Sequence, residues 1–195
     1  MIPRKLTPFD KQKLINHFIF DIKDADRRLR FGIKTTDEMI EKYIEKSLKH
    51  FGRTNMWFVV DLGDKIIATC HVSIDKENES AEMGCTVSPD FRNQKIGQEL
   101  FQRGVTWANM AGAKHIFMYC LSENEVIQHI ARKNGMTVVT IDPSEKESKI
   151  TVKQNRFESG FRDYIMDQIA VYDSAVRQQY FFMNKYLKQI RGEGL

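Results

Sequence analysis

The sequence predicts an α/β fold, with a mixed, largely antiparallel sheet flanked by helices and a long helix at the C-terminus. Three observations predict it. Strand-like apolar runs recur between residues 56 and 153, helical periodicities with capping residues stand among them, and one uninterrupted helical stripe occupies the end of the chain. We expect one domain over residues 1–154 and a C-terminal helical extension over residues 155–195.

Composition indicates a globular protein with one sizeable core. Of the 195 residues, 42% are hydrophobic and 29% are charged, and no apolar run approaches the length that spans a membrane. The N-terminus lacks the apolar segment of a signal peptide, so we expect a cytoplasmic protein without a membrane partner. Cys70, Cys85 and Cys120 lie in apolar runs without Cys-x-x-Cys spacing and are expected to be reduced core residues.

The formal net charge of +4 is spread along the chain rather than gathered in a block. Such a charge suits an anionic small molecule as well as nucleic acid. However, the basic stripe with interleaved aromatic residues that nucleic-acid binding needs is not visible, and zinc-spaced cysteine or histidine pairs are missing. We therefore expect neither a nucleic-acid partner nor a metal site.

The first quarter of the chain predicts a short strand and two helices. The strand candidate is Ile2–Leu6, and a Thr-Pro pair, typical of a helix start, follows it. A second helix is expected to be capped by Thr35 or Thr36 and to stop at Gly52. Between the helices lies the charge-dense link Asp24–Gly32. We expect a solvated loop there, with its apolar side chains in the core and no binding role for a single arginine.

Three strands are expected next. Met56–Leu62 and Lys65–Ile74 flank a Gly-Asp pair, which predicts an antiparallel hairpin, and Ala81–Val87 follows. His71 shares a strand face with hydroxyl side chains; we expect a hydrogen bond within the sheet, with a position in a substrate cleft as the alternative. Gly84, in the middle of a strand, indicates a bulge or a close approach to the backbone.

A polar loop leads from the third strand into a helix expected over Ile96–Ala111. A strand that feeds such a loop leaves backbone N–H groups unpaired at the helix start, backed by the positive end of the macrodipole. Such a place binds phosphate. Arg92 and Lys95 add positive charge, and Gly97 lets a ligand approach the backbone closely.

The next segments complete the predicted sheet. Lys114–Leu121 is expected to run parallel to Ala81–Val87, because a helix joins the two strands as a crossover. Ser122–Glu125 forms a capping box that starts another helix. Met136–Asp142 and Lys149–Lys153 are expected as the last two strands, around a polar loop.

The segment from Phe157 onward predicts one long helix. Its apolar residues recur at a mean spacing of about 3.6, the period of a straight helix, which favours a helix laid on a globular surface over a sustained coiled coil. The stripe either packs against the same chain or forms the seam of a homodimer, and both alternatives stay open. The apolar stripe consists of Phe161, Ile165, Ile169, Tyr172, Val176, Tyr180, Met183, Leu187 and Ile190.

Two motifs carry a resemblance to a known family. The segment from Arg92 to Gly97 resembles the Gln/Arg-x-x-Gly-x-Gly/Ala loop by which GNAT-type N-acetyltransferases hold the pyrophosphate of acetyl-CoA. Lys95 stands where the family usually has its first glycine, and it either strains the loop or adds a cation. Asn124 begins a segment that resembles the family pattern Asn…Tyr-x-x-x-Gly-Phe, with Ala131 at the tyrosine position.

The resemblance implies a GNAT-like domain over residues 1–154 that binds acetyl-CoA as cosubstrate. The first two helices and the link between them would line the acceptor pocket. The two strands Ala81–Val87 and Lys114–Leu121 would splay apart around the cosubstrate. The implied acetyl-CoA contacts are Cys85, Thr86, Val87, Arg92, Asn93, Gln94, Lys95, Ile96, Gly97, Gln98 and Asn124.

The implied activity is transfer of an acetyl group to an amine of a small molecule or protein, by direct attack in a ternary complex. The Gly84–Val87 backbone would stabilise the oxyanion, and Glu82 is the candidate general base. Alternatively, Glu82 is simply exposed or paired with a lysine. Ala131 leaves the general acid unassigned. Tyr119 is the alternative acid, but a tyrosine in an apolar strand is expected to be core. A non-catalytic acyl-CoA-binding sensor or interaction module is the alternative function, which Lys95 and Ala131 keep open.

Overall fold

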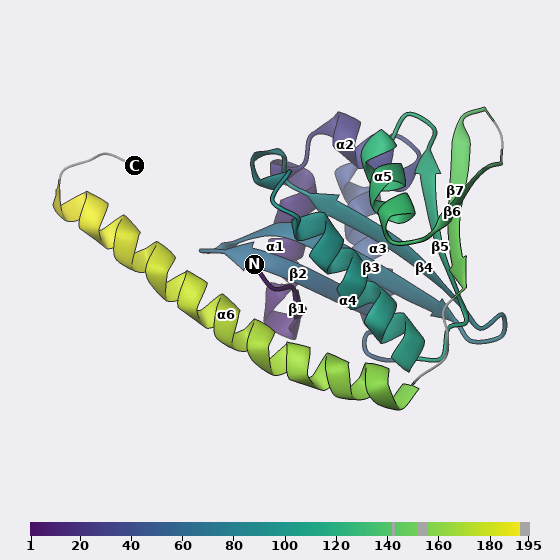
Figure 1. Cartoon of the computed structure of the whole chain (residues 1–195). Coiled ribbons are helices and arrows are strands. Elements are labelled where there is room, and N and C mark those ends of the chain that lie inside the picture. The colour runs from purple at the N-terminus through teal and green to yellow at the C-terminus, as the bar shows by residue number, and fades with distance from the viewer. Residues whose placement is uncertain (142, 152–155, 192–195) are drawn as a thin grey trace.

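The computed structural model describes residues 1–141, 143–151 and 156–191, and it has the predicted mixed α/β architecture (Figure 1). One seven-stranded sheet has the order β1-β2-β3-β4-β5-β7-β6. Neighbouring strands are antiparallel except β4 and β5, which are parallel as predicted. The strands are β1 (Arg4–Lys5), β2 (Asn55–Leu62), β3 (Lys65–Asp75), β4 (Ser80–Val87), β5 (His115–Leu121), β6 (Thr137–Thr140) and β7 (Glu145–Thr151).

Helices cover both faces of this sheet. No helix in the described ranges is both long and apolar enough to cross a membrane. The α-helices are α1 (Lys11–Asn16), α2 (Asp24–Phe31), α3 (Asp37–Lys49), α4 (Ile96–Met110), α5 (Glu125–Lys133) and α6 (Arg156–Ile190), and shorter helical turns span Pro8–Asp10, His17–Asp21 and Pro89–Phe91.

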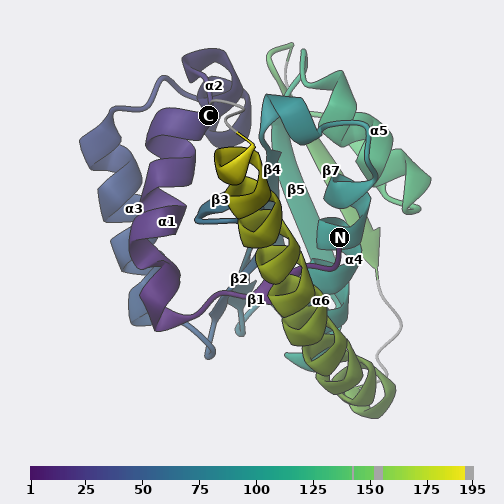
Figure 2. The same ribbon diagram turned by 90° about the vertical axis from the view of Figure 1, so that its left-hand side faces the viewer.

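The sheet separates two apolar clusters, one on each face (Figures 1 and 2). Trp57 and Phe58 are neighbours in β2 and point to opposite faces, as the strand alternation requires. Trp57 packs with Phe18 and Ile44 beneath α1 and α3, whereas Phe58 belongs to the cluster beneath α4 and α5. Both aromatic side chains are fully buried, and each contributes about 2–3 kcal/mol of hydrophobic stabilisation.

The link Asp24–Gly32 is helix α2 and not the loop that we expected. Asp24 and Asp26 lie in its first turn and Arg28 and Arg30 in its last turn, so the charges suit the helix dipole. Gly32 ends the helix with a left-handed φ of 76°. None of the α2 residues is fully buried, so the helix lacks the apolar stripe by which periodicity reveals helices.

Two later boundaries also differ from the prediction. Asn124, rather than Ser122, caps α5, because its side-chain oxygen accepts a hydrogen bond from the Ile127 amide. Strand β7 begins at Glu145, within the predicted loop, because pairing with β5 and β6 on both edges overrides its polar composition. The predicted domain boundary at 154/155 and the end of the last predicted strand, residues 152–153, lie outside the described residues.

Helix α6 packs against α4, β1 and β2 through a polar face. Asp163, on this face, is 3% exposed and forms an ion pair of 3.0 Å with Arg103 of α4. Arg103 also pairs with Asp167, and its guanidinium lies 5.0 Å from the centre of the Phe58 ring. The contact therefore depends on buried charges that compensate one another.

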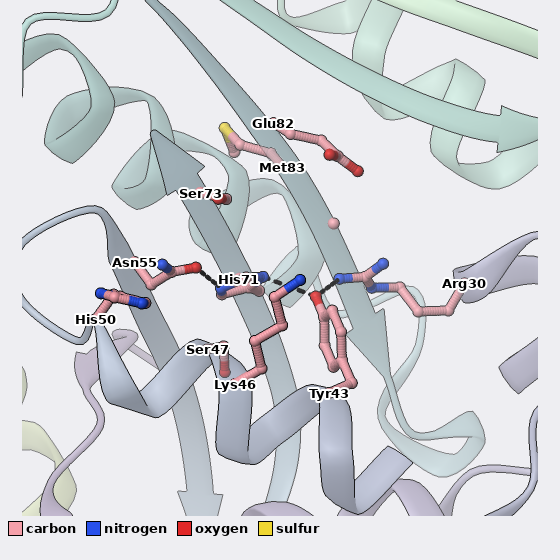
Figure 3. Close-up of a pocket in the computed structure, with 11 residues that line it drawn as sticks. Arg30, Tyr43, Lys46, Ser47, His50, Asn55, His71, Ser73, Glu82 and Met83 are labelled. Carbon is pink, nitrogen blue, oxygen red and sulfur yellow. Dashed lines mark hydrogen bonds between the residues drawn. The ribbon is translucent and has the colours of Figure 1, made fainter. Parts of the chain in front are cut away.

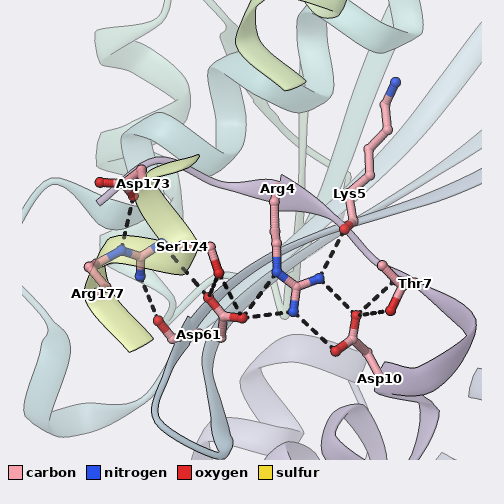
Figure 4. A network of polar contacts seen from close by, with 8 residues as sticks. All are labelled: Arg4, Lys5, Thr7, Asp10, Asp61, Asp173, Ser174 and Arg177. Carbon is pink, nitrogen blue, oxygen red and sulfur yellow. Dashed lines mark hydrogen bonds and ion pairs between the residues drawn. The ribbon is translucent and has the colours of Figure 1, made fainter. Parts of the chain in front are cut away.

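A second polar network joins α6 to β1 and β2 (Figure 4). Asp61 of β2 is 3% exposed and accepts hydrogen bonds from Arg4 at 2.7 Å and from the Ser174 hydroxyl at 2.9 Å. Arg177 donates to the Asp61 carbonyl at 2.5 Å and to Asp173 at 2.9 Å. The carboxylate of Asp61 thus links the N-terminal strand to the C-terminal helix.

The apolar stripe of α6 is not the face that packs on the domain. Its residues are exposed, from 39% at Ile165 to 73% at Tyr172. Packing of this stripe against the same chain, one of the two alternatives, is therefore wrong. The second half of α6 extends beyond the sheet and carries the stripe with it (Figure 1).

Candidate active site

Strand β4 has an open edge next to β5. The two strands pair only at their start, where Ser80, Ala81 and Glu82 lie opposite His115, Ile116 and Phe117. Beyond Glu82, no described strand pairs with this edge, so β4 presents free backbone groups there up to Val87. This is the predicted splay.

The other edge of β4 pairs with β3 in continuous register from Ser80 to Val87. The bulge predicted at Gly84 is therefore absent. The close approach predicted there is present, because a Cβ added to Gly84 would overlap the guanidinium of Arg30. Among the other β4 residues expected at the cosubstrate, Cys85 and Val87 are half-buried, and Thr86 is buried with an unpaired hydroxyl oxygen.

The loop after β4 leaves a row of donors at the start of α4. Over residues 93–97, no backbone N–H donates a hydrogen bond to any part of the chain that the structure describes. The first N–H that does so is that of Gln98, which reaches the Lys95 carbonyl at 3.0 Å. Ile96 contributes only its backbone here, because its side chain is buried. This arrangement suits an anion with several oxygen atoms.

Two residues of this loop adopt the left-handed conformation. Asn93 and Lys95 both have φ of 62°, and Lys95 is the N-cap of α4. Such a conformation costs a residue with a side chain about 1 kcal/mol relative to glycine. Lys95 therefore strains the loop, and because its side chain is also exposed, it keeps a cation at the helix start.

Arg92 lies between β4 and α2. Its guanidinium pairs with Asp26 at 2.8 Å, and its Nε donates to the Val87 carbonyl at 3.3 Å. The side chain stays 42% exposed, so an anion at the helix start can still reach it.

Asn124 joins α5 to α2. Besides capping α5, its amide nitrogen donates to the Leu29 carbonyl at 3.3 Å. Ala131 is fully buried in the core beneath α4 and α5. Tyr119 is 52% exposed, so the expectation that it belongs to the core is wrong. Desolvation, then a hydrogen bond that the phenol donates to Glu147, and the charges of Glu147 and Glu82 raise the pKa of Tyr119.

A pocket of about 240 Å³ lies beside β4, between the sheet and helices α2 and α3 (Figure 3). Register explains why β3 and β4 contribute to one wall: Ser73 lies opposite Glu82, and His71 lies opposite Gly84. The lining residues are Arg30, Tyr43, Lys46, Ser47, His50, Asn55, His71, Ser73, Glu82, Met83 and Gly84.

A chain of hydrogen bonds crosses this pocket (Figure 3). Arg30 donates to the Tyr43 hydroxyl at 3.1 Å, this hydroxyl lies 2.7 Å from His71 Nδ1, and His71 Nε2 lies 2.9 Å from the Asn55 side-chain oxygen. Because the Asn55 oxygen only accepts hydrogen bonds, His71 donates one to it from Nε2. At Nδ1, His71 therefore accepts a hydrogen bond from the Tyr43 hydroxyl.

His71 is neutral at pH 7. Burial, and secondly the charge of Arg30, lower the pKa of His71 to about 3. Its ring stacks on Trp57 with 4.4 Å between ring centroids. The hydrogen bond that we expected is confirmed, and His71 also lines the pocket.

Glu82 is exposed and lines the pocket, and it forms no ion pair with any described residue. The alternative of a lysine partner is therefore wrong. Sequence reasoning missed Arg30, Tyr43 and Asn55 as pocket residues. A signal was available for Arg30, which lies in a link that the family resemblance places beside the acceptor, but we expected a solvated loop there.

Comparisons with known proteins bear on the family and the fold. The family model for the acetyltransferase (GNAT) domain matches residues 4–137. No curated protein sequence matches the chain.

Solved structures share the fold at low sequence identity. The GNAT domain of S. lividans PAT has a TM-score of 0.69 at 14% identity, covering 77% of this chain and 89% of that one. PaiA N-acetyltransferase from Thermoplasma acidophilum, in complex with coenzyme A, has a TM-score of 0.58 at 18% identity, covering 77% of this chain and 98% of that one. A variant of spermidine N-acetyltransferase SpeG from Vibrio cholerae has a TM-score of 0.57 at 16% identity, covering 77% of this chain and 95% of that one.

Proposed function

The chain belongs to the GNAT acetyltransferase family, and we propose that it transfers the acetyl group of acetyl-CoA to an amine by direct attack within a ternary complex. One observation carries the proposal. The open edge of β4 has unpaired N–H groups and two cations at its C-terminal end, and it borders a pocket that holds the unpaired carboxylate of Glu82.

The residues present fit acetyl-CoA. The backbone N–H groups of residues 93–97, with the side chains of Arg92 and Lys95, would hold the pyrophosphate at the start of α4. The free edge of β4 at Cys85–Val87 would pair with the amides of the pantetheine arm, as an added strand does. Asn124 would contribute from the opposite side. Bound in this way, acetyl-CoA supplies the activated acetyl group.

Residues of this chain would then act on the acceptor. Glu82 would take a proton from the ammonium form of the acceptor, which attacks only as a free amine. A backbone N–H of β4, near Gly84, would stabilise the negative charge that develops on the thioester oxygen. The C–S bond then breaks, and the leaving CoA thiolate takes up the proton that the nitrogen loses as the amide forms. Holding both substrates in one cleft supplies much of the remaining rate.

Replacement of Glu82 by Gln tests the proposal. We expect kcat to fall about 100-fold or more, with the Kd of acetyl-CoA unchanged, because the variant loses the base but keeps the donors of the loop. The acceptors screened with acetyl-CoA are primary amines, peptides with free N-termini and spermidine, the last because a similar structure is a spermidine N-acetyltransferase. Glu77→Gln, in the exposed β3–β4 turn, is the matched control.

The same measurement discriminates the alternative function. A non-catalytic acyl-CoA-binding module would bind acetyl-CoA without transfer to any acceptor, and Glu82→Gln would change nothing. The buried Ala131, at the tyrosine position of the family pattern, is the observation that favours this alternative.

We also propose that the chain forms a homodimer through the apolar stripe of α6. The exposure of the stripe supports this proposal. The unpaired cysteines suit a reducing compartment, and we propose a cytoplasmic location.

Light scattering tests the dimer. Val176→Glu places a charge in the stripe and is expected to give a monomer. Val171→Glu, on the same helix but off the stripe, is the matched control, because Val171 is 62% exposed and Val176 is 47% exposed. A wild-type monomer, or equal effects of both changes, would contradict the proposal.

A further inference from the structure

Arg30 reaches from α2 across the pocket to the backbone of β4. Its guanidinium occupies the space that a side chain at Gly84 would need. It lies 5.0 Å from the centre of the Phe31 ring and 5.9 Å from that of Tyr43, and both contacts hold the cation in place. Gly84 of β4, Phe31 of α2 and Tyr43 of α3 thus fix the position of the Arg30 guanidinium.

This arginine has no anionic partner within the described ranges. A guanidinium carries five N–H donors, yet the hydrogen bond to Tyr43 is the one that Arg30 makes to described residues, and its Nε is buried without an acceptor. Two comparable arginines are compensated: the half-buried Arg4 binds Asp10 and Asp61, and the buried Arg103 binds Asp163 and Asp167. A half-buried guanidinium without a carboxylate partner is costly unless a ligand supplies the anion.

The other residues that line the pocket do not supply an anionic partner for Arg30, so a ligand would have to supply it. His71 is neutral, and Tyr43 and Asn55 carry no charge at neutral pH. Lys46 adds a second cation at the exposed rim, and Glu82 is the one carboxylate among the lining residues. The pocket therefore offers a cationic part beside a carboxylate that can receive an amine.

We propose that this pocket selects a substrate that carries a carboxylate, and that Arg30 binds this carboxylate through paired N–H donors. The inference rests on the proposed function and adds a substrate class to it. Two sources present the same chemistry. One is the acceptor, an amino acid whose amine lies toward Glu82, and the other is a dicarboxylic acyl group, as in succinyl-CoA. The cavity volume of about 240 Å³ limits either to a small group.

Transfer assays separate the two sources. In the first arm, amino acids are compared with their C-terminal amides as acceptors of acetyl groups. In the second, succinyl-CoA is compared with acetyl-CoA on the same amide acceptors. We expect one arm to favour the carboxylate about tenfold or more in kcat/KM, and Arg30→Gln to abolish that preference. Arg28→Gln, on the same helix but outside the pocket, is the control.

A binding measurement decides the inference independently of turnover. The guanidinium Nε–H signal of Arg30, identified by its loss in Arg30→Lys, is followed by NMR during titration with acetate and with acetamide. We expect a saturable shift with acetate and none with acetamide.

If Arg30 does not respond to acetate and neither arm shows an Arg30-dependent preference, the inference is overturned. If Arg30 responds but no acceptor is acetylated, the carboxylate site stands while the proposed function fails.

Discussion

At the scale of single residues, Lys95 gives the clearest energetic prediction. Its φ of 62° is a conformation that glycine adopts without cost. We therefore expect Lys95→Gly to raise the free energy of unfolding by about 1 kcal/mol in urea titrations. Lys95→Ala, which keeps a Cβ, is the control and is expected to leave stability near that of the wild type. Equal stability of all three would show that the loop is not strained.

Gly84 and Arg30 are predicted to be energetically coupled. Gly84→Ala places a methyl group on the Arg30 guanidinium, and overpacking of this kind costs about 1–3 kcal/mol. In an Arg30→Ala background the methyl group has room, so the second substitution is expected to cost far less. A double-mutant cycle from urea unfolding measures the coupling, and additive effects would contradict the observed contact.

At the scale of elements, the anchoring of α6 is predicted to depend on Asp61. Asp61→Ala removes the carboxylate that pairs with Arg4 and Arg177. Breaking a buried ion pair lowers the free energy of unfolding by about 3–5 kcal/mol. The exposed pair between Lys11 and Glu45 is the control, where Glu45→Ala is expected to leave the free energy of unfolding close to that of the wild type. Chemical denaturation checks both values. Similar small losses would mean that the network does not hold the helix.

The elements that the sequence predicted well are those with a repeating apolar pattern. The hairpin from Met56 to Ile74 and the helix after Lys95 lie close to their predicted bounds, because each buries one face against the core. Helix α2 was missed because it buries no residue completely. The apolar stripe of α6 did not predict which face of the helix packs on the domain, because the helix docks through Asp163, Ser174 and other polar residues.

The candidate site was predictable in part for the same reason. Local spacing identified the loop around Arg92 and the donors at the start of α4. The pocket depends on long-range contacts instead, such as the one between Arg30 and Gly84, which are 54 positions apart in the sequence. No local pattern encodes which arginine of a charged segment turns inward, because tertiary packing decides it.

At the scale of the whole molecule, stability is predicted to fall in mild acid. Burial lowers the pKa of His17 to about 4 and that of His71 to about 3, against about 6.5 in the unfolded chain. The unfolded state therefore binds more protons below pH 6.5, and stability is lost as pH falls from there toward pH 4. Each histidine accounts for about 1–2 kcal/mol between pH 7 and pH 5.

Urea midpoints at pH 7, 6 and 5.5 check this prediction. His71→Gln removes one of the two groups, so its free energy of unfolding is expected to depend about half as steeply on pH as that of the wild type. If the free energy of unfolding of this variant depends on pH as steeply as that of the wild type, the assignment of His71 as a buried neutral ring is contradicted.

The molecule brings its two proposed substrate sites to one strand. Strand β4 faces the proposed acetyl-CoA cleft along its open edge, and its residues Glu82 and Gly84 line the pocket below α2 and α3. Direct transfer between the two sites requires this shared position. Binding of acetyl-CoA at the open edge is therefore the central claim.

Calorimetric titration of the protein with acetyl-CoA tests this claim most directly. We predict saturable binding that weakens about tenfold or more in Arg92→Ala, because a charge-assisted phosphate contact is lost. Arg162→Ala, an exposed arginine of α6, is the control and is expected to bind like the wild type. Absence of binding, or equal affinity in all three proteins, would contradict the placement of acetyl-CoA at the start of α4.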